Sequence, residues 1–165
     1  MNKKFITVLL IIILTGFSGL VLGVSPERTE RISDFIRITY REYGEAEFDR
    51  VYARLHPEIK NCLERERYRE YQQEHYEQLQ LEIKEVEVEE VNEIKELTPL
   101  LTELLNEIEM EYFEASIRYL AAFDTELGRQ ERELKKKVLI GIEVEEEEEV
   151  LYLLWDPSPV FEEEE

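Results

Sequence analysis

The hydrophobic positions of the chain follow a helical period first and a strand period afterwards. Between residues 25 and 79, apolar side chains recur every three or four positions, as on one face of an amphipathic helix. Three stretches carry this period, at 26–44, 48–63 and 68–79, and the second continues for one further turn beyond a histidine–proline pair. The first half of the chain therefore predicts three amphipathic helices.

From residue 81 onward, alternation of apolar and polar residues replaces the helical period. Four segments show it, at 81–91, 108–123, 138–144 and 150–155. Alternation of this kind is typical of strands with one buried face. In the first of the four segments the alternation slips by one residue, which predicts a β-bulge.

Short charged connections join these predicted strands. Residues 124–131 and 145–149 predict turns, whereas 96–105 predicts either a short helix after Pro99 or a crossing loop. Strands joined in this way pair as an antiparallel meander, with the helices packed on one face. The order predicts an α+β two-layer domain with a curved sheet of about four strands. Its concave side would be a pocket faced by the aromatic helices.

The first 24 residues form a separate segment. Residues 5–24 are an uncharged apolar run that follows Lys3 and Lys4. About 20 apolar residues cross the hydrocarbon core of a bilayer, and basic residues before such a run keep the N-terminus in the cytoplasm. We expect a signal anchor that places the rest of the chain on the extracytoplasmic face of the membrane. The alternative is a signal peptide cleaved after Gly23, which would make the protein secreted.

The charge of the remaining chain argues against a nucleic-acid partner. The 165 residues include 40 acidic and 20 basic side chains, and their formal net charge is −20. Without Lys3 and Lys4 the acidic excess is larger still, and nucleic-acid binding needs a basic surface. Cys62 is the single cysteine, so no intrachain disulfide or cysteine zinc site is possible. Its helical position predicts a small buried hydrophobe.

The sequence contains no recognisable catalytic motif, so we assign no catalytic residue, no metal and no cofactor. The two histidines, His56 and His75, are too few for a zinc site without cysteines. We expect His56 to cap a helix or contact a turn, and His75 to be a half-buried histidine on an aromatic helix face. The acidic runs 145–149 and 162–165 lack the spaced ligands of a calcium loop, which favours a solvated turn and an acidic tail.

The closing segment carries a resemblance to a known family. The motif Trp-Asp-Pro-Ser, one variable residue, an aliphatic residue and Phe ends the nuclear transport factor 2-like N-terminal domain of penicillin-binding proteins (the MecA N-terminal domain family). Residues 155–161 match it, with Pro159 in the variable slot. Segments 40–60, 66–88 and 119–140 resemble the family's helices and hairpin in order, so the resemblance covers residues 26–161. The matching motif residues are Trp155, Asp156, Pro157, Ser158, Val160 and Phe161.

The resemblance implies a cone-shaped domain at 25–161, preceded by the membrane segment 1–24 and followed by the acidic tail 162–165. In the family this domain carries no catalytic residue and acts as a spacer before a transpeptidase domain. Here four glutamates follow the motif instead. We therefore expect a non-catalytic, extracytoplasmic binding or spacer domain associated with cell-wall synthesis. Its partner would be a protein, such as a separately encoded transpeptidase, or a cell-wall component.

Two other hypotheses remain open. The wider superfamily includes isomerases and small-molecule binders that use a pocket inside the cone. A truncated remnant of a longer transpeptidase is the third hypothesis. In the pocket hypothesis the candidate residues are Tyr40, Tyr52, His75, Tyr76 and Asp124.

Overall fold

The computed structural model describes residues 24–79, 82–125 and 128–162. The predicted membrane segment 5–24 lies outside these residues except for Val24, and so do the last three residues of the acidic tail. No helix within the described ranges is long and apolar enough to cross a membrane.

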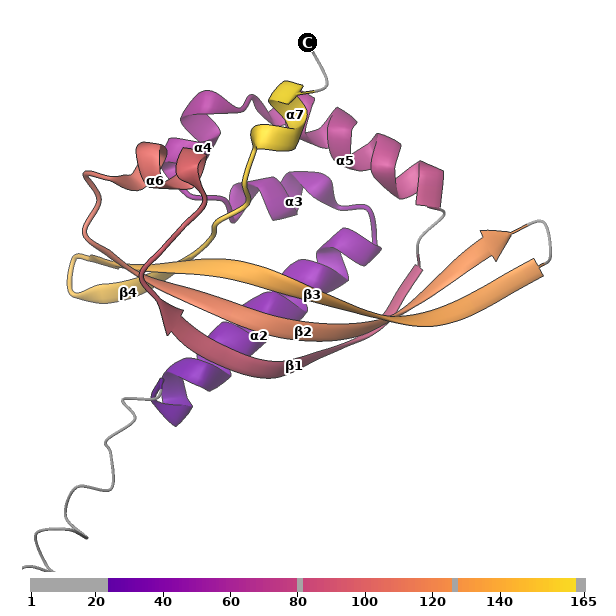
Figure 1. The fold of residues 1–165 in the computed structure, drawn as a ribbon, viewed down its shortest axis with the longest axis horizontal. Coiled ribbons are helices and arrows are strands. Elements are labelled where there is room, and N and C mark those ends of the chain that lie inside the picture. The colour runs from indigo at the N-terminus through magenta and orange to yellow at the C-terminus, as the bar shows by residue number, and fades with distance from the viewer. Residues whose placement is uncertain (1–23, 80–81, 126–127, 163–165) are drawn as a thin grey trace, which may run out of the picture.

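The described chain is an α+β domain with an antiparallel four-stranded sheet, as the periodicity predicts (Figure 1). Four helices precede the sheet, one lies between its first two strands, and one follows its last strand. The elements are α2 (Pro26–Gly44), α3 (Phe48–Ala53), α4 (Pro57–Cys62), α5 (Arg65–Leu79), β1 (Glu82–Ile94), α6 (Pro99–Leu105), β2 (Met110–Thr125), β3 (Gly128–Glu145), β4 (Glu148–Leu153) and α7 (Ser158–Glu162).

The prediction of three helices before the sheet is wrong, because the second stripe forms two helices, α3 and α4. Proline disfavours helical backbone at the residue before it, and His56 has an extended conformation with φ −59° and ψ 144°. Leu55 bridges to Leu153 of β4 at this break. The break therefore ties the helical layer to the last strand. The segment 96–105 resolves as helix α6 after Pro99.

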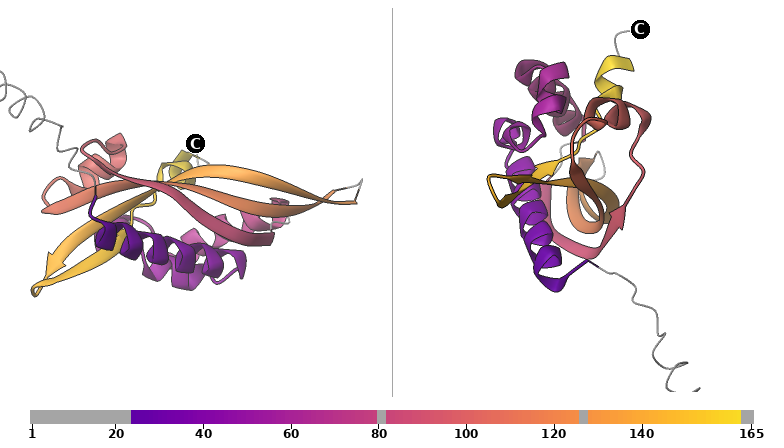
Figure 2. Two further views of the ribbon diagram at one scale, coloured as in Figure 1. Left: turned by 90° about the horizontal axis from the view of Figure 1, so that it is seen from below. Right: turned by 90° about the vertical axis from the view of Figure 1, so that its left-hand side faces the viewer.

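The sheet has the order β1-β2-β3-β4 and is strongly twisted and curved (Figure 2). The predicted bulge in the first strand is confirmed by register shifts between Ile83 and Glu85 and between Val88 and Glu90. The turn predicted at 124–131 is too long, because β2 and β3 stay paired as far as Thr125 and Gly128. Gly128 has a φ of +98°, which a residue without a Cβ adopts most easily.

One face of the sheet carries the core. The apolar positions of β2 and β3 alternate onto the side on which α2 lies, where they pack with Ile32 and Ile36 of that helix. The side chains from the sheet are fully or almost fully buried, and they are Phe113, Ala115, Ile117, Val138, Ile140 and Ile142.

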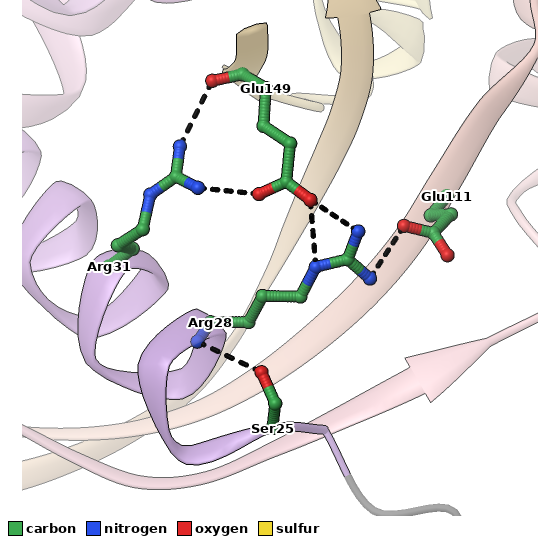
Figure 3. Close-up of polar contacts among 5 residues, drawn as sticks. All are labelled: Ser25, Arg28, Arg31, Glu111 and Glu149. Atoms are coloured by element: carbon green, nitrogen blue, oxygen red, sulfur yellow. Dashed lines mark hydrogen bonds and ion pairs between the residues drawn. The ribbon is translucent and has the colours of Figure 1, made fainter. Parts of the chain in front are cut away.

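Ion pairs fasten the start of α2 to the same face (Figure 3). Ser25 caps the helix by accepting a hydrogen bond from the Arg28 backbone N–H at 3.3 Å. The Arg28 side chain bonds Glu149 of β4 and Glu111 of β2, with 2.7 Å between its Nη1 and Glu111 Oε2. Arg31 also bonds the Glu149 carboxylate, and it donates to the Glu149 carbonyl at 3.0 Å. The two arginines thus hold α2 across strands that are distant in sequence.

The described chain enters and leaves the domain on opposite sides. In the view of Figure 1 the first turn of α2 lies below the sheet, whereas α7 lies above it, near the middle of the long axis and beside the start of α5 (Figures 1 and 2). Between these two helices the chain leaves the sheet after β4 and crosses towards the helical layer. Its Leu153 N–H donates to the Arg54 carbonyl at 2.8 Å, and the Leu154 N–H donates to the Leu139 carbonyl at 2.9 Å.

Candidate functional site

A cavity of about 520 Å³ lies between α2, α5, the core face of the sheet and the segment after β4. Ligand pockets in proteins commonly measure 300–1,000 Å³ and combine aromatic walls with a few polar groups. This cavity has that character, because tyrosines supply most of its aromatic wall and two lysines, Lys136 and Lys137, also line it. The residues that matter for its chemistry are Tyr40, Tyr43, Tyr68, Tyr119, Lys136 and Trp155.

The cavity contains two of the five pocket candidates, Tyr40 and His75. Tyr52 and Tyr76 are absent from the cavity wall because their hydroxyls hold the backbone elsewhere. The Tyr52 hydroxyl donates to the Leu63 carbonyl at 2.8 Å, and that of Tyr76 donates to the Gly44 carbonyl at 3.0 Å. Asp124 lies one residue from the end of β2, where its backbone pairs with Arg129 at the far end of the hairpin.

Four tyrosine hydroxyls at the cavity have no protein hydrogen-bond partner among the described residues: those of Tyr40, Tyr43, Tyr68 and Tyr119. Burial raises the pKa of Tyr40 most, and its neighbours Tyr119, Tyr43 and Tyr68 raise that pKa further. Burial likewise raises the pKa of Tyr43 to about 12 and raises the pKa values of Tyr68 and Tyr119. These phenols are therefore neutral donors at physiological pH.

Lys136 lies on the cavity side of the sheet because of its register. It stands opposite Ile117, which is fully buried on the core face, and cross-strand partners share a face. Desolvation lowers the pKa of its ammonium group. Lys136 was not among the candidate residues predicted from the sequence, although the alternation of Val138, Ile140 and Ile142 extends back to position 136 and assigns it to the inner face.

The two histidines have structural contacts. His56 is the N-cap of α4 and accepts a hydrogen bond from the Glu58 backbone N–H through Nδ1 at 3.1 Å, which confirms the predicted cap. His75 is half-buried beside Tyr71, with its ring 4.1 Å from the tyrosine ring. Its Nδ1 lies 2.9 Å from the Tyr71 carbonyl and donates to it. That nitrogen is therefore engaged by the backbone of its own helix.

The closing motif folds back onto α5 at the edge of the cavity. The Trp155 ring stands edge-on to Tyr68, with centroids 5.3 Å apart and an interplanar angle of 86°. Asp156 Oδ1 accepts from the Ser158 N–H at 2.9 Å and from the Ser158 hydroxyl at 2.6 Å. Phe161 lies 5.3 Å from the Arg67 guanidinium carbon, in cation–π geometry.

Pro157 completes the same turn, because its carbonyl accepts the Val160 N–H at 3.0 Å. Val160 is buried, and its own carbonyl accepts a hydrogen bond from Arg67 at 3.2 Å. The two-proline segment therefore forms a short helix, α7, that is docked on the domain.

The prediction for Cys62 is wrong, since its side chain is exposed at the end of α4. The stripe of α4 buries Ile59, and Cys62 lies one turn later at the solvent edge, where its thiol donates to the Ile59 carbonyl at 3.1 Å. Within the described part of the chain, no group of three or more His, Cys, Asp and Glu side chains is placed to hold a metal ion.

Neither the known protein-family models nor the curated proteins contain a match to this chain.

Proposed function

We propose that this protein is a non-catalytic binding and spacer domain on the extracytoplasmic face of the membrane, of the nuclear transport factor 2-like class. The proposal combines the resemblance of residues 155–161 to the N-terminal domain of penicillin-binding proteins with the order of helices followed by a curved antiparallel sheet. Its partner would be a separately encoded transpeptidase or a component of the cell wall.

The position of the two chain ends is the observation that carries the spacer role. The residues that follow the predicted membrane segment enter below the sheet in the view of Figure 1, and α7 lies above it. A domain arranged in this way places its sheet and helices between the membrane and whatever binds near α7. The docked contacts of Trp155 and Phe161 make that end rigid, because both rings pack on side chains of α5.

The chemistry of the cavity supports a non-catalytic role. A general base must be within hydrogen-bond reach of a substrate proton, with a free acceptor. Oδ1 of Asp156 is occupied by Ser158. His75 donates through Nδ1 to the Tyr71 carbonyl, which leaves Nε2 as an acceptor, but the described residues that line the cavity include no serine or cysteine for it to activate. The phenols have raised pKa values and stay protonated. These groups do not form the paired nucleophile and base of a hydrolase.

The test uses the full-length chain with a fluorescent penicillin and with purified peptidoglycan sacculi. We expect no covalent labelling, and we expect retention of the protein on sacculi or co-purification with a membrane-bound transpeptidase in 0.15 M salt. Covalent labelling of any serine would overturn the non-catalytic assignment. Absence of the protein from both the sacculi and the transpeptidase fractions would overturn the binding role.

The cavity favours a second candidate function, a small-molecule-binding or isomerase-type pocket protein of the same superfamily. Its volume of about 520 Å³ and its unbonded hydroxyls suit a small ligand. Of these two activities the cavity supports binding better, because Asp124, the candidate carboxylate, lies at the far end of the β2–β3 hairpin.

A further inference from the structure

Three consecutive lysines on β3 differ in their partners. Lys135 pairs with Glu89, with 3.2 Å between its Nζ and the carboxylate, and Lys137 pairs with Glu114 at 2.7 Å. Lys137 borders the cavity, but its ammonium group is held by Glu114, which alternates with the core residues of β2 and so lies on the other face of the sheet. Lys136 points to the cavity side, and no described carboxylate forms an ion pair with it.

Lys136 has no carboxylate partner among the described residues of a chain that is rich in acidic side chains. Acidic residues outnumber basic ones by 40 to 20, so a carboxylate partner would be easy to supply. Lys136 is exposed at the cavity rather than enclosed by protein, and partial desolvation by its neighbours lowers the pKa of its ammonium group. A cation kept in this position is suited to a negative group that arrives from outside the chain.

Tyrosine hydroxyls on the wall of the same cavity could supply the rest of an anion site. Tyr119 stands two residues from Ile117 on β2, and its ring centroid lies 5.8 Å from that of Tyr40 on α2. Both hydroxyls are without a protein partner among the residues described, and both belong to neutral phenols. Neutral O–H donors bind a carboxylate without adding charge, while the rings and Trp155 offer apolar surface.

We propose that the cavity binds a small organic anion, a carboxylate with an apolar body. Its carboxylate pairs with the Lys136 ammonium group and accepts hydrogen bonds from the hydroxyls of Tyr40 and Tyr119. Its apolar part lies against the aromatic wall that ends at Trp155. The inference deepens the second candidate function, on which it rests, and it is independent of the spacer role.

The experiment compares two probes of nearly equal shape, 4-phenylbutanoate and its neutral amide, 4-phenylbutanamide, on the full-length chain. Trp155 is the only tryptophan and lines the cavity, so its fluorescence reports occupancy. We expect saturable binding of the carboxylate with a Kd of about 1 mM or tighter, and binding of the amide about tenfold weaker. Titration calorimetry provides a second readout that does not depend on the fluorophore.

Substitutions on β3 locate the charge. Lys136→Met should remove the preference, so that both probes bind within about twofold of each other, and Lys136→Arg should retain it. Lys137→Met is the matched control, because its ammonium group is bound to Glu114, and it should leave the preference unchanged. Circular dichroism establishes that each variant is folded.

Three results would overturn the proposal: no saturable carboxylate binding, equal binding of acid and amide to the wild type, or a preference that survives in folded Lys136→Met. None of them affects the spacer role, which is tested by penicillin labelling and by sedimentation with sacculi. Failure of that role would likewise leave the probe titration unchanged.

Discussion

Arg54 and Glu42 form a two-pronged ion pair between the break after α3 and the last turns of α2. Arg54 Nε and Nη2 donate to the two Glu42 carboxylate oxygens at 2.7 and 2.9 Å. The Glu42 side chain is only 8% exposed, and the Arg54 guanidinium also lies 5.4 Å from the centre of the Phe35 ring. The hydrogen bonds from Arg54 lower the pKa of Glu42 against the opposing effect of burial.

Removal of the arginine should therefore be costly. We expect Arg54→Met to lower the free energy of unfolding by about 3 kcal/mol, because it leaves a buried carboxylate unpaired. The folded-state pKa of Glu42 is below its unfolded value, so the pair stabilises the fold above the unfolded pKa. This contribution is lost as the pH falls through the folded-state pKa. Urea denaturation of both proteins should show a difference that shrinks towards pH 3.

Arg37 provides the control for this pair. It bonds Asp34 at 2.9 Å, but both side chains are more than half exposed. Arg37→Met should change stability by less than about 0.5 kcal/mol, since exposed ion pairs contribute little. Equal effects of the two substitutions would show that burial does not set the strength of the Arg54 pair.

The turn between β3 and β4 offers a stabilising substitution. Glu146 and Glu147 have φ values of +48° and +74°, which marks a two-residue turn with both central residues in the left-handed region. Asn-Gly suits this turn better than two glutamates. We expect the double substitution Glu146→Asn, Glu147→Gly to raise the free energy of unfolding by about 1 kcal/mol. Thermal unfolding measures the gain.

Glu148→Gln tests whether that gain arises from charge alone. Glu148 is exposed and is the first residue of β4, so its substitution removes a negative charge and leaves the turn unchanged. If Glu148→Gln stabilises the protein as much as the double substitution, the backbone explanation is wrong.

The closing motif should contribute to stability through Trp155. We expect Trp155→Ala to cost about 3 kcal/mol, because it removes the ring that packs on Tyr68 and Tyr71. Trp155→Phe should cost less than half of this, since a phenyl ring retains part of the contact. Thermal unfolding followed by circular dichroism measures both variants. Faster hydrogen exchange at α7 in the alanine variant only would confirm that the ring docks this helix.

His56 should make stability depend on pH. Burial lowers its pKa, although Glu143, with 3.4 Å between His56 Nε2 and Oε2, acts in the opposite direction. The unfolded state then binds more protons than the folded state, so stability should fall as the pH drops below about 6.5. Denaturation midpoints at pH 7.5 and 5.5 measure this change.

His56→Asn separates protonation from capping, because asparagine can still accept the hydrogen bond of the Glu58 N–H. The variant should keep most of the stability at pH 7.5 and lose the pH dependence above pH 5.5. A wild-type protein that is equally stable at both pH values would contradict the assignment.

The sequence by itself determined that helices precede a four-stranded antiparallel sheet and which strand positions form its buried face. Alternation places Val138, Ile140 and Ile142 on one face, and by extension Lys136, because the side-chain period of a strand is two residues. It also determined the cap at His56, since a residue before proline leaves the helix and has an acceptor to offer.

Only the tertiary structure decided which aromatic residues surround the cavity. Tyr40 and Tyr52 both lie on apolar helix stripes, yet one lines the cavity and the other donates to the Leu63 carbonyl. Periodicity specifies which face of a helix is buried. Where a side chain of that face lies relative to the cavity depends on the curvature of the sheet and on the break at Pro57. For the same reason the ion pairs of Lys135 and Lys137 follow from the register of β3 with β2 and of β2 with β1.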